Sequence, residues 1–178
     1  MDLQSSVYGP QSEFRDQTFA DHIFKDIDAY GSSWRNCIFR DANLTNINFT
    51  GCVLLNTRFI NCSFSNVSFF HGDLRSTVFE DCSLKRSYIG LASAKNSIWS
   101  NTSINFTTLL DIDIQFSAWT ECRIAKSHFI RVDFASSQIS SLKFRQTQII
   151  DCRLPVKHID PRELTDCYVD QQSFFLEV

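Results

Sequence analysis

Large apolar residues recur at every fifth position along almost the whole chain. Steps of five in both directions from Phe64 reach 33 consecutive positions, from Phe14 to Phe174, and every one is apolar. A strand repeats every two residues and a helix about every 3.6, so neither explains this period. Self-similarity at a short fixed period is typical of a solenoid in which each unit forms part of one coil. Because the register does not slip, we expect no inserted loop between residues 14 and 174.

Each five-residue unit has a second constrained position, two residues before the central apolar one. It carries Ala, Cys, Ser, Thr, Gly or Val in 24 of the 33 units, which predicts a small slot that faces inward. All seven cysteines occupy this slot, and no two are closer than ten residues. Metal sites of the finger type need closer pairs, whereas Cys packs as a compact hydrophobe. We therefore expect structural cysteines and no metal site.

The last position of each unit indicates how the chain turns. It is often Asp, Asn or Gly, residue types that tolerate left-handed backbone and bond their own backbone in turns. This predicts a corner in every unit and explains how a chain with only five glycines and three prolines can turn so often. Examples of this position are Asp41, Asn46, Gly51, Asn56, Asn61 and Asn66.

Residues 40–49, "RDANLTNINF", contain the unit Ala42-Asn43-Leu44-Thr45-Asn46. This unit resembles the consensus of the pentapeptide-repeat family, and the resemblance covers residues 14–174. It implies an all-β fold, a right-handed quadrilateral β-helix in which four units form one coil of 20 residues. About 8 coils stacked at about 4.8 Å would make a single rod about 38 Å long.

The same resemblance divides the chain into three parts. Residues 1–13 form an N-terminal cap, and residues 14–154 form the β-helix. Residues 155–178 supply the last coil, a C-terminal cap and a dimerisation segment. The apolar end that would form this cap or dimer contact consists of Phe174, Phe175, Leu176 and Val178.

Residues 20 apart would share one column of one face, and two such groups are charged. The acidic column is Asp21, Asp41, Asn61, Asp81, Asn101 and Glu121, with Glu80 beside it. The basic patch, on another face, is Lys85, Arg86, Arg123, Lys126, Lys143 and Arg145. Each group is either an ordinary solvated surface of mixed charge or a charged contact face.

A third column is apolar although its side chains should point outward. This apolar column is Tyr30, Thr50, Phe70, Gly90, Leu110, Ile130 and Ile150, flanked by Tyr88 and Leu91. A contiguous exposed apolar surface usually marks an interface. The column therefore predicts a protein contact, and the alternative is that a terminal segment folds over it.

Composition and motifs narrow the classes of function. A hydrophobic content of 43% excludes disorder, and a net charge of −3 gives no general attraction to nucleic acid or anionic membranes. There is no apolar run of about 18 residues and no signal-peptide pattern in residues 1–10, so we expect a cytoplasmic protein outside the membrane. The four histidines match no catalytic or ligand spacing. We expect no enzyme and no cofactor.

The closing segment resembles the quinolone-resistance branch of the family, Qnr and MfpA, through Asp160-Pro161-Arg162. The resemblance implies a bacterial protein that binds DNA gyrase or topoisomerase IV as a DNA mimic and protects it from quinolones or gyrase poisons. The acidic column would then replace phosphates, and the C-terminal end would make a homodimer. Duplex DNA carries about 22 charges over about 38 Å, so a chain with net charge −3 can mimic it only locally. The alternative is an interaction scaffold or bacterial effector rod that binds a protein through the apolar column.

Overall fold

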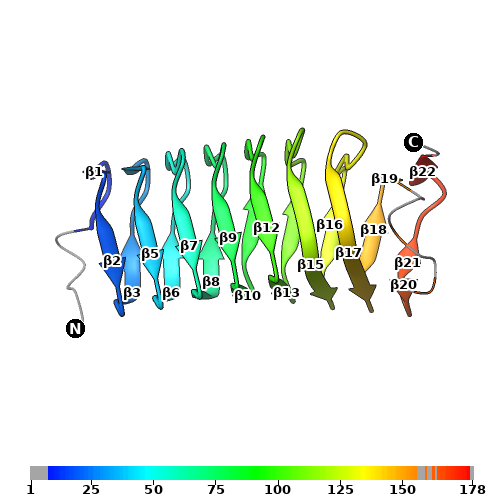
Figure 1. The fold of residues 1–178 in the computed structure, drawn as a ribbon, viewed down its shortest axis with the longest axis horizontal. Helices are drawn as coiled ribbons and strands as arrows, with labels where there is room; N and C mark the ends of the chain where they lie inside the picture. Colours follow the sequence, from blue (N-terminus) through cyan, green and yellow to red (C-terminus); the bar gives the residue numbers. More distant parts are fainter. Residues whose placement is uncertain (1–7, 156–158, 160–161, 163, 177–178) are drawn as a thin grey trace.

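The computed structural model describes residues 8–155, 159, 162 and 164–176, which form a right-handed parallel β-helix of about 8 coils. The described residues are organised as short strands joined by corners, as the sequence predicted. Strands of successive coils lie side by side along the rod, and the first and last described strands lie at its opposite ends (Figure 1).

The strands form four faces, numbered here in chain order. Face 1 contains β1 (Glu13–Arg15), β4 (Ser33–Arg35), β19 (Arg153–Pro155) and β22 (Phe174–Leu176), with single bridges between them. Face 2 contains β2 (Thr18–Ala20), β5 (Ile38–Arg40), β7 (Arg58–Ile60), β9 (Val78–Glu80) and β12 (Ile98–Ser100). Face 3 contains β10 (Ser83–Lys85), β13 (Ser103–Asn105) and β20 (Leu164–Thr165). Face 4 contains β11 (Tyr88–Gly90), β14 (Thr108–Leu110), β16 (His128–Ile130), β18 (Gln148–Ile150) and β21 (Tyr168–Val169).

Five longer strands pass around a corner and belong to two faces. Faces 2 and 3 share β15 (Ala118–Ala125) and β17 (Gln138–Arg145). Faces 3 and 4 share β3 (Ile23–Asp28), β6 (Asn43–Asn48) and β8 (Ser63–Ser68). Neighbouring strands are parallel and pair residues 20 apart, as in Leu44 with Phe64. This offset confirms four units per coil.

The expectation of an unbroken register to Phe174 was wrong at the C-terminal end. Val169 still pairs with Ile149, but Phe175 pairs with Leu154, an offset of 21 residues. The extra residue enters where the Asp170 carboxylate accepts hydrogen bonds from the backbone N–H and the hydroxyl of Ser173. This local turn takes one residue more than an ordinary corner.

Stacked rings fill the axis of the rod. Along face 2, the rings of Phe39, Phe59, Phe79, Trp99 and Trp119 follow one another with centroid separations of 4.8, 5.2, 4.1 and 4.7 Å. All five side chains are completely buried. The central positions of the other faces are also buried across the middle of the chain, so the predicted inward column is confirmed.

The N-terminal end of this column is closed by Tyr8. Its ring lies 5.3 Å from Phe14, 5.3 Å from Phe24 and 5.6 Å from Trp34, and it is buried. Residues 1–7 of the expected cap lie outside the described residues.

The small inward slot has a hydrogen-bonding role that the sequence argument did not foresee. Thr77 donates to the carbonyl of Leu54 at 2.9 Å, and Cys52 donates to the carbonyl of Ala29 at 2.9 Å. In ten slots, these two included, the side chain donates to the carbonyl of the residue 23 positions earlier. That residue is the central apolar residue of a unit in the previous coil. Ser, Thr and Cys therefore suit the slot because they are small and can donate.

The predicted corner in every unit is confirmed by the backbone. From residue 11 to residue 151 the last position of each unit has positive φ, with Ser136 as the exception. Left-handed backbone costs roughly 1–2 kcal/mol for most L-residues but little for Gly or Asn. The Asn and Asp side chains also bond along the rod, since Asn56 donates to Asn36 at 3.2 Å.

Replacing Asn56 by Val tests the corner. Asn56 has φ 58° and is exposed, so the change removes no buried contact. We expect Asn56→Val to lower the free energy of unfolding by about 1–2 kcal/mol, because a β-branched side chain resists this backbone. The control Asn56→Gly keeps the backbone and loses only the Asn36 bond. Equal urea midpoints for Asn56→Val and wild type would contradict the prediction.

Candidate functional site

The outer surface is where function can reside, because the interior of the described chain is filled. Its depressions lie on the outside and are open, with volumes of about 300–400 Å³. Within residues 8–155, 159, 162 and 164–176 there is no cluster of three potential metal ligands. The same residues contain no helix long and apolar enough to cross a membrane.

Six of the seven cysteines are buried and Cys167 is half-buried. All seven are free thiols, and the pKa values of Cys52, Cys122 and Cys152 are raised to about 11 because burial disfavours the thiolate. Cys62 and Cys82 are stacked on adjacent coils, and the neighbouring Cys62 and burial raise the pKa of Cys82. A thiol that is protonated at neutral pH is a poor nucleophile.

The structure places the acidic column on the corner between faces 2 and 3. Asp21, Asp41, Asp81 and Glu121 are all exposed and have left-handed backbone. Two of these carboxylates accept a hydrogen bond from an asparagine side chain of the next coil. Asn61 donates to Asp41 at 2.5 Å, and Asn101 donates to Asp81 at 2.7 Å.

Basic side chains reduce the negative charge beside this column. Glu80 lies within face 2 rather than on the corner, and its carboxylate is 3.4 Å from the guanidinium of Arg58. Arg40 is exposed next to Asp41 in the sequence. The structure therefore brings Asp21, Asp41, Asp81 and Glu121 into one line but not into a continuous negative face.

The apolar column lies along face 4. Gly90, Leu110, Ile130 and Ile150 are direct partners on four successive parallel strands, with spacing of about 4.8 Å. At this spacing neighbouring side chains cover one another, and all but the buried Gly90 are half-buried. The result is a continuous apolar stripe along the C-terminal half of the rod.

Aromatic residues extend this stripe. Phe70 and Tyr88 have ring centroids 5.8 Å apart, and Tyr88 lies against Gly90, where an added Cβ would meet its hydroxyl at 2.5 Å. At the margins, Tyr30 is 51% exposed and Leu91 is 44% exposed. No described segment folds over these two side chains. The alternative of a terminal cover stays a prediction, because it concerns segments that lie partly outside the described residues.

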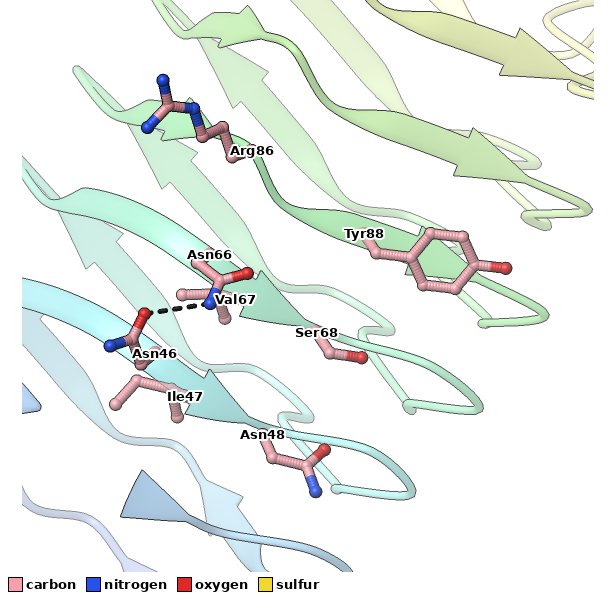
Figure 2. Close-up of a pocket in the computed structure, with 8 residues that line it drawn as sticks. All are labelled: Asn46, Ile47, Asn48, Asn66, Val67, Ser68, Arg86 and Tyr88. Atoms are coloured by element: carbon pink, nitrogen blue, oxygen red, sulfur yellow. Dashed lines mark hydrogen bonds between the residues drawn. The ribbon is translucent and has the colours of Figure 1, made fainter. Parts of the chain in front are cut away.

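A polar depression of about 300 Å³ borders the stripe at the corner of faces 3 and 4 (Figure 2). Asn66 donates to Asn46 at 2.9 Å across it, and Arg86 and Tyr88 stand on the next coil (Figure 2). Asn48 and Ser68 complete its polar lining, and Ile47 and Val67 its apolar floor. An apolar centre with a polar rim is the usual anatomy of a protein interface.

Among the described residues, sequence reasoning missed five large exposed apolar side chains, namely Ile23, Ile98, Phe106, Phe116 and Tyr168. Phe106 and Phe116 occupy corners with φ 52° and 59° and are 50% and 66% exposed, and Ile98 on face 2 is 45% exposed. Phe106 borders face 4 and carries the ammonium of Lys126 at 5.3 Å from its ring. An aromatic residue in the corner position, where Asn or Asp is the rule, was the signal that would have found the two phenylalanines.

The basic patch lies on face 3 and its corner with face 4. Arg123 pairs with Lys143, and Ala125 with Arg145, on adjacent strands. Lys85 lies on the same face two coils before Arg123, with Asn105 on the coil between them. Lys85, Arg123, Lys143 and Arg145 lie on face 3, and Arg86 and Lys126 lie on its corner with face 4.

The proposed C-terminal contact lies mostly outside the described structure. The backbone of Phe174, Phe175 and Leu176 forms β22, but their side chains and Val178 lie outside the described residues. Of the Asp-Pro-Arg motif, only Arg162 is described. The homodimer stays a prediction.

Comparison with known proteins agrees with this architecture. Residues 24–54 and 37–75 match the family model described as pentapeptide repeats, with 8 copies. The match identifies pentapeptide repeats in residues 24–75, in agreement with the period of five and the four-faced coil. No curated protein matches the chain.

Several solved structures resemble the chain at low identity. A trypsin-treated variant of QnrB1, a plasmid-mediated fluoroquinolone resistance protein, is 15% identical with a TM-score of 0.48, covering 90% of this chain and 92% of that one. HetL, a pentapeptide-repeat protein involved in heterocyst differentiation regulation in Nostoc sp. strain PCC 7120, is 10% identical with a TM-score of 0.31, covering 92% and 87%. A pentapeptide-repeat protein from the Arabidopsis thaliana thylakoid lumen is 13% identical with a TM-score of 0.26, covering 67% and 72%.

Proposed function

We propose that this chain is a non-enzymatic protein-binding rod whose contact surface is the apolar column of face 4. The observation that carries the proposal is the continuity of Leu110, Ile130 and Ile150 on adjacent strands beside the rings of Phe70 and Tyr88. A flat parallel sheet holds these side chains at fixed spacing. Binding of a partner therefore does not cost the conformational entropy of ordering a mobile surface. Aromatic anchors are the residues that most often dominate such contacts.

A second candidate is binding of a type II topoisomerase, DNA gyrase or topoisomerase IV, through the acidic column. The observation that favours it is the line of exposed carboxylates at Asp21, Asp41, Asp81 and Glu121 along one corner. The resemblance of the closing segment names the enzyme to test. Arg40 and the Arg58–Glu80 pair weigh against it, because they reduce the negative field that would replace phosphates.

Site-specific photo-crosslinking in cells tests the apolar column directly. A photoreactive amino acid replaces Leu110 on face 4 or, as the matched control, Ser65 on face 3. We expect a defined crosslinked partner from position 110 only, and competition by purified wild type. Ile130→Asp should compete about 30-fold less well, which corresponds to loss of a contact worth about 2 kcal/mol. Identical crosslinks from both positions, or equal competition by Ile130→Asp, would contradict the proposal.

Supercoiling by DNA gyrase in the presence of a quinolone separates the two candidates. If the acidic column makes the contact, wild type rescues or inhibits supercoiling and Asp41→Lys/Asp81→Lys does not, whereas Ile130→Asp behaves as wild type. If the apolar column binds gyrase, Ile130→Asp loses the effect on supercoiling and Asp41→Lys/Asp81→Lys behaves as wild type. No effect of wild type at tens of micromolar removes topoisomerase as the partner and leaves the crosslinking result to identify another.

A further inference from the structure

The apolar column of face 4 is too small to hold a partner by itself. From Phe70 to Ile150 it covers successive coils over about 19 Å, and one face of the rod is about 10–15 Å wide. This part of the column therefore offers roughly 200–300 Å², whereas a specific protein interface buries about 800 Å² on each partner. A partner bound to the column must also contact a neighbouring corner.

The two corners that border the column differ in charge. The corner between faces 3 and 4 has two cations and no carboxylate beside the column, and its residues there are Asn46, Asn66, Arg86, Phe106, Lys126 and Gln146. The corner between faces 4 and 1 has one cation and two carboxylates, and its residues there are His71, Leu91, Asp111, Arg131 and Asp151. The Arg131 guanidinium is already paired with the Asp111 carboxylate, through hydrogen bonds of 2.5 and 2.6 Å.

Arg86 and Lys126 are the two cations of the corner between faces 3 and 4, and both are exposed. Among the residues that the structure describes, neither has a carboxylate within 4.0 Å. They lie two coils apart, about 9.6 Å along the rod. Their positive charges are therefore available to carboxylates of a partner.

Each of these cations lies beside an apolar part of the surface. The ammonium of Lys126 is 5.3 Å from the ring centroid of Phe106, which is 50% exposed. Arg86 borders the depression of about 300 Å³ that Tyr88 also lines (Figure 2). None of the residues that line this depression is acidic, and the Ser68 hydroxyl at its rim is a further donor for a carboxylate. Apolar and cationic contacts therefore alternate along this corner.

We infer that the partner of the apolar column is a protein surface with a row of apolar side chains and a row of carboxylates beside it, bound across the corner between faces 3 and 4. The apolar row covers Leu110, Ile130 and Ile150, and the carboxylates pair with Arg86 and Lys126. Such charge pairs at the rim of an interface fix the register of the partner and exclude partners of the wrong charge. This inference rests on the proposed function, because it specifies the partner of the same column.

A nucleic acid could also pair with the two cations, but the column beside them favours a protein. Over about 19 Å a DNA duplex carries about 11 charges, and the bordering corner offers only Arg86 and Lys126. The remaining phosphates would lie against Leu110 and Ile130, which provide no side-chain donor, and their loss of hydration would not be compensated. A protein surface can match both the apolar row and the cations.

Photo-crosslinking at two corner positions tests the direction in which the partner extends. A photoreactive aromatic amino acid replaces Phe106 on the corner between faces 3 and 4 or, as the matched control, Leu91 on the corner between faces 4 and 1. Both are apolar corner residues with left-handed backbone, and they are 50% and 44% exposed. We expect the protein that crosslinks to position 110 to crosslink to position 106 as well, and not to position 91. Mass spectrometry of the crosslinked peptides should place Asp or Glu residues beside the point of attachment to position 106.

Competition by purified variants tests the charge. Arg86→Glu/Lys126→Glu should compete at least about tenfold less well than wild type for the crosslink from position 110, because two attractive pairs become repulsive. Arg35→Glu/Arg40→Glu makes the same change of charge on faces 1 and 2 and should compete as wild type does. Melting temperatures equal to that of wild type show that the variants are folded.

The possible outcomes separate this inference from the proposed function. If no protein crosslinks to position 110, both fail. If a protein crosslinks to position 110 but both double variants compete equally, or if it reaches position 91 and not position 106, only the acidic partner is overturned. A crosslinked species that nuclease digests would also overturn it, because the partner would then be a nucleic acid.

Discussion

Replacing Trp99 by Ala is expected to lower the free energy of unfolding by about 3–5 kcal/mol, the largest effect of any single change considered for this chain. Trp99 is completely buried and lies between two parallel rings. Its centroid is 4.1 Å from Phe79 at an interplanar angle of 16°, and 4.7 Å from Trp119 at 4°. Truncation leaves a void in the middle of the stack, and neither coil can move inward without shifting its strand in the ladder.

The loss should be local, because each coil of a solenoid contacts only its neighbours. Amide hydrogen exchange should therefore rise first in the strands around Trp99, and the urea midpoint measured by circular dichroism should fall. Phe116→Ala is the matched control, since it removes an aromatic ring that is 66% exposed. We expect the control to change stability by less than about 0.5 kcal/mol. A loss below about 1 kcal/mol for Trp99→Ala would show that the ring stack is not the main source of stability.

Trp99 also makes a polar contact that can be recognised in the sequence. Its indole N–H donates to the hydroxyl of Ser97 at 2.9 Å, and Trp119 donates to Ser117 at 2.9 Å in the same way. Trp34 repeats the arrangement with Ser32. A buried indole needs an acceptor, and a side chain two residues earlier points to the same side of a strand. The spacing Ser-x-Trp at all three tryptophans therefore predicts this pair.

The periodicity was sufficient to predict the coils, the inward columns and the corners, because each depends only on which residue type recurs at which step. Phe64 and Leu84 are buried partners for this reason. The register slip near Phe175 was not predictable, because Phe174 is also apolar and fits the period of five equally well. A turn stabilised by Asp170 and Ser173 decides between them.

The candidate surfaces were predictable as columns but not as electrostatic environments. Spacing of 20 brought Asp41 and Asp81 onto one corner, as expected. It did not show that Asn61 and Asn101 donate to them, or that Arg58 reaches Glu80. Those contacts depend on side-chain rotamers between coils, which a one-dimensional pattern does not contain.

The corners between faces 3 and 4 carry a second feature that no pattern revealed. The backbone N–H of Ser87 donates to the Thr107 hydroxyl at 3.3 Å, and the N–H of Thr107 donates to the Ser127 hydroxyl at 3.1 Å. Thr107 is completely buried, and its own hydroxyl donates to the carbonyl of Asn105 at 3.0 Å. At this corner, side-chain hydroxyl groups replace the backbone carbonyl that would normally accept from the amide.

At other corners the backbone N–H of the corresponding slot residue donates to a backbone carbonyl instead of a hydroxyl group. The N–H of Thr77 donates to the carbonyl of Leu74 at 3.1 Å within a turn, and the Thr77 hydroxyl donates to the carbonyl of Leu54 at 2.9 Å. Loss of the Thr77 hydroxyl therefore leaves no amide without a partner. Thr77 and Thr107 are both buried threonines in the small slot whose hydroxyl groups donate to a backbone carbonyl, and of the two the Thr107 hydroxyl also accepts from a backbone N–H.

Thr107→Val should accordingly lower the free energy of unfolding by about 1–3 kcal/mol, and by more than Thr77→Val does, because the buried N–H of Ser87 loses its only acceptor. Val keeps the shape of Thr, so little of the loss comes from packing. Thr107→Ser retains the hydroxyl and should recover most of the stability. Urea unfolding of the three variants, with amide exchange at Ser87 as a local readout, measures the difference. Equal losses for Thr107→Val and Thr77→Val would show that the hydrogen bond from the Ser87 N–H to the Thr107 hydroxyl contributes nothing of its own to stability.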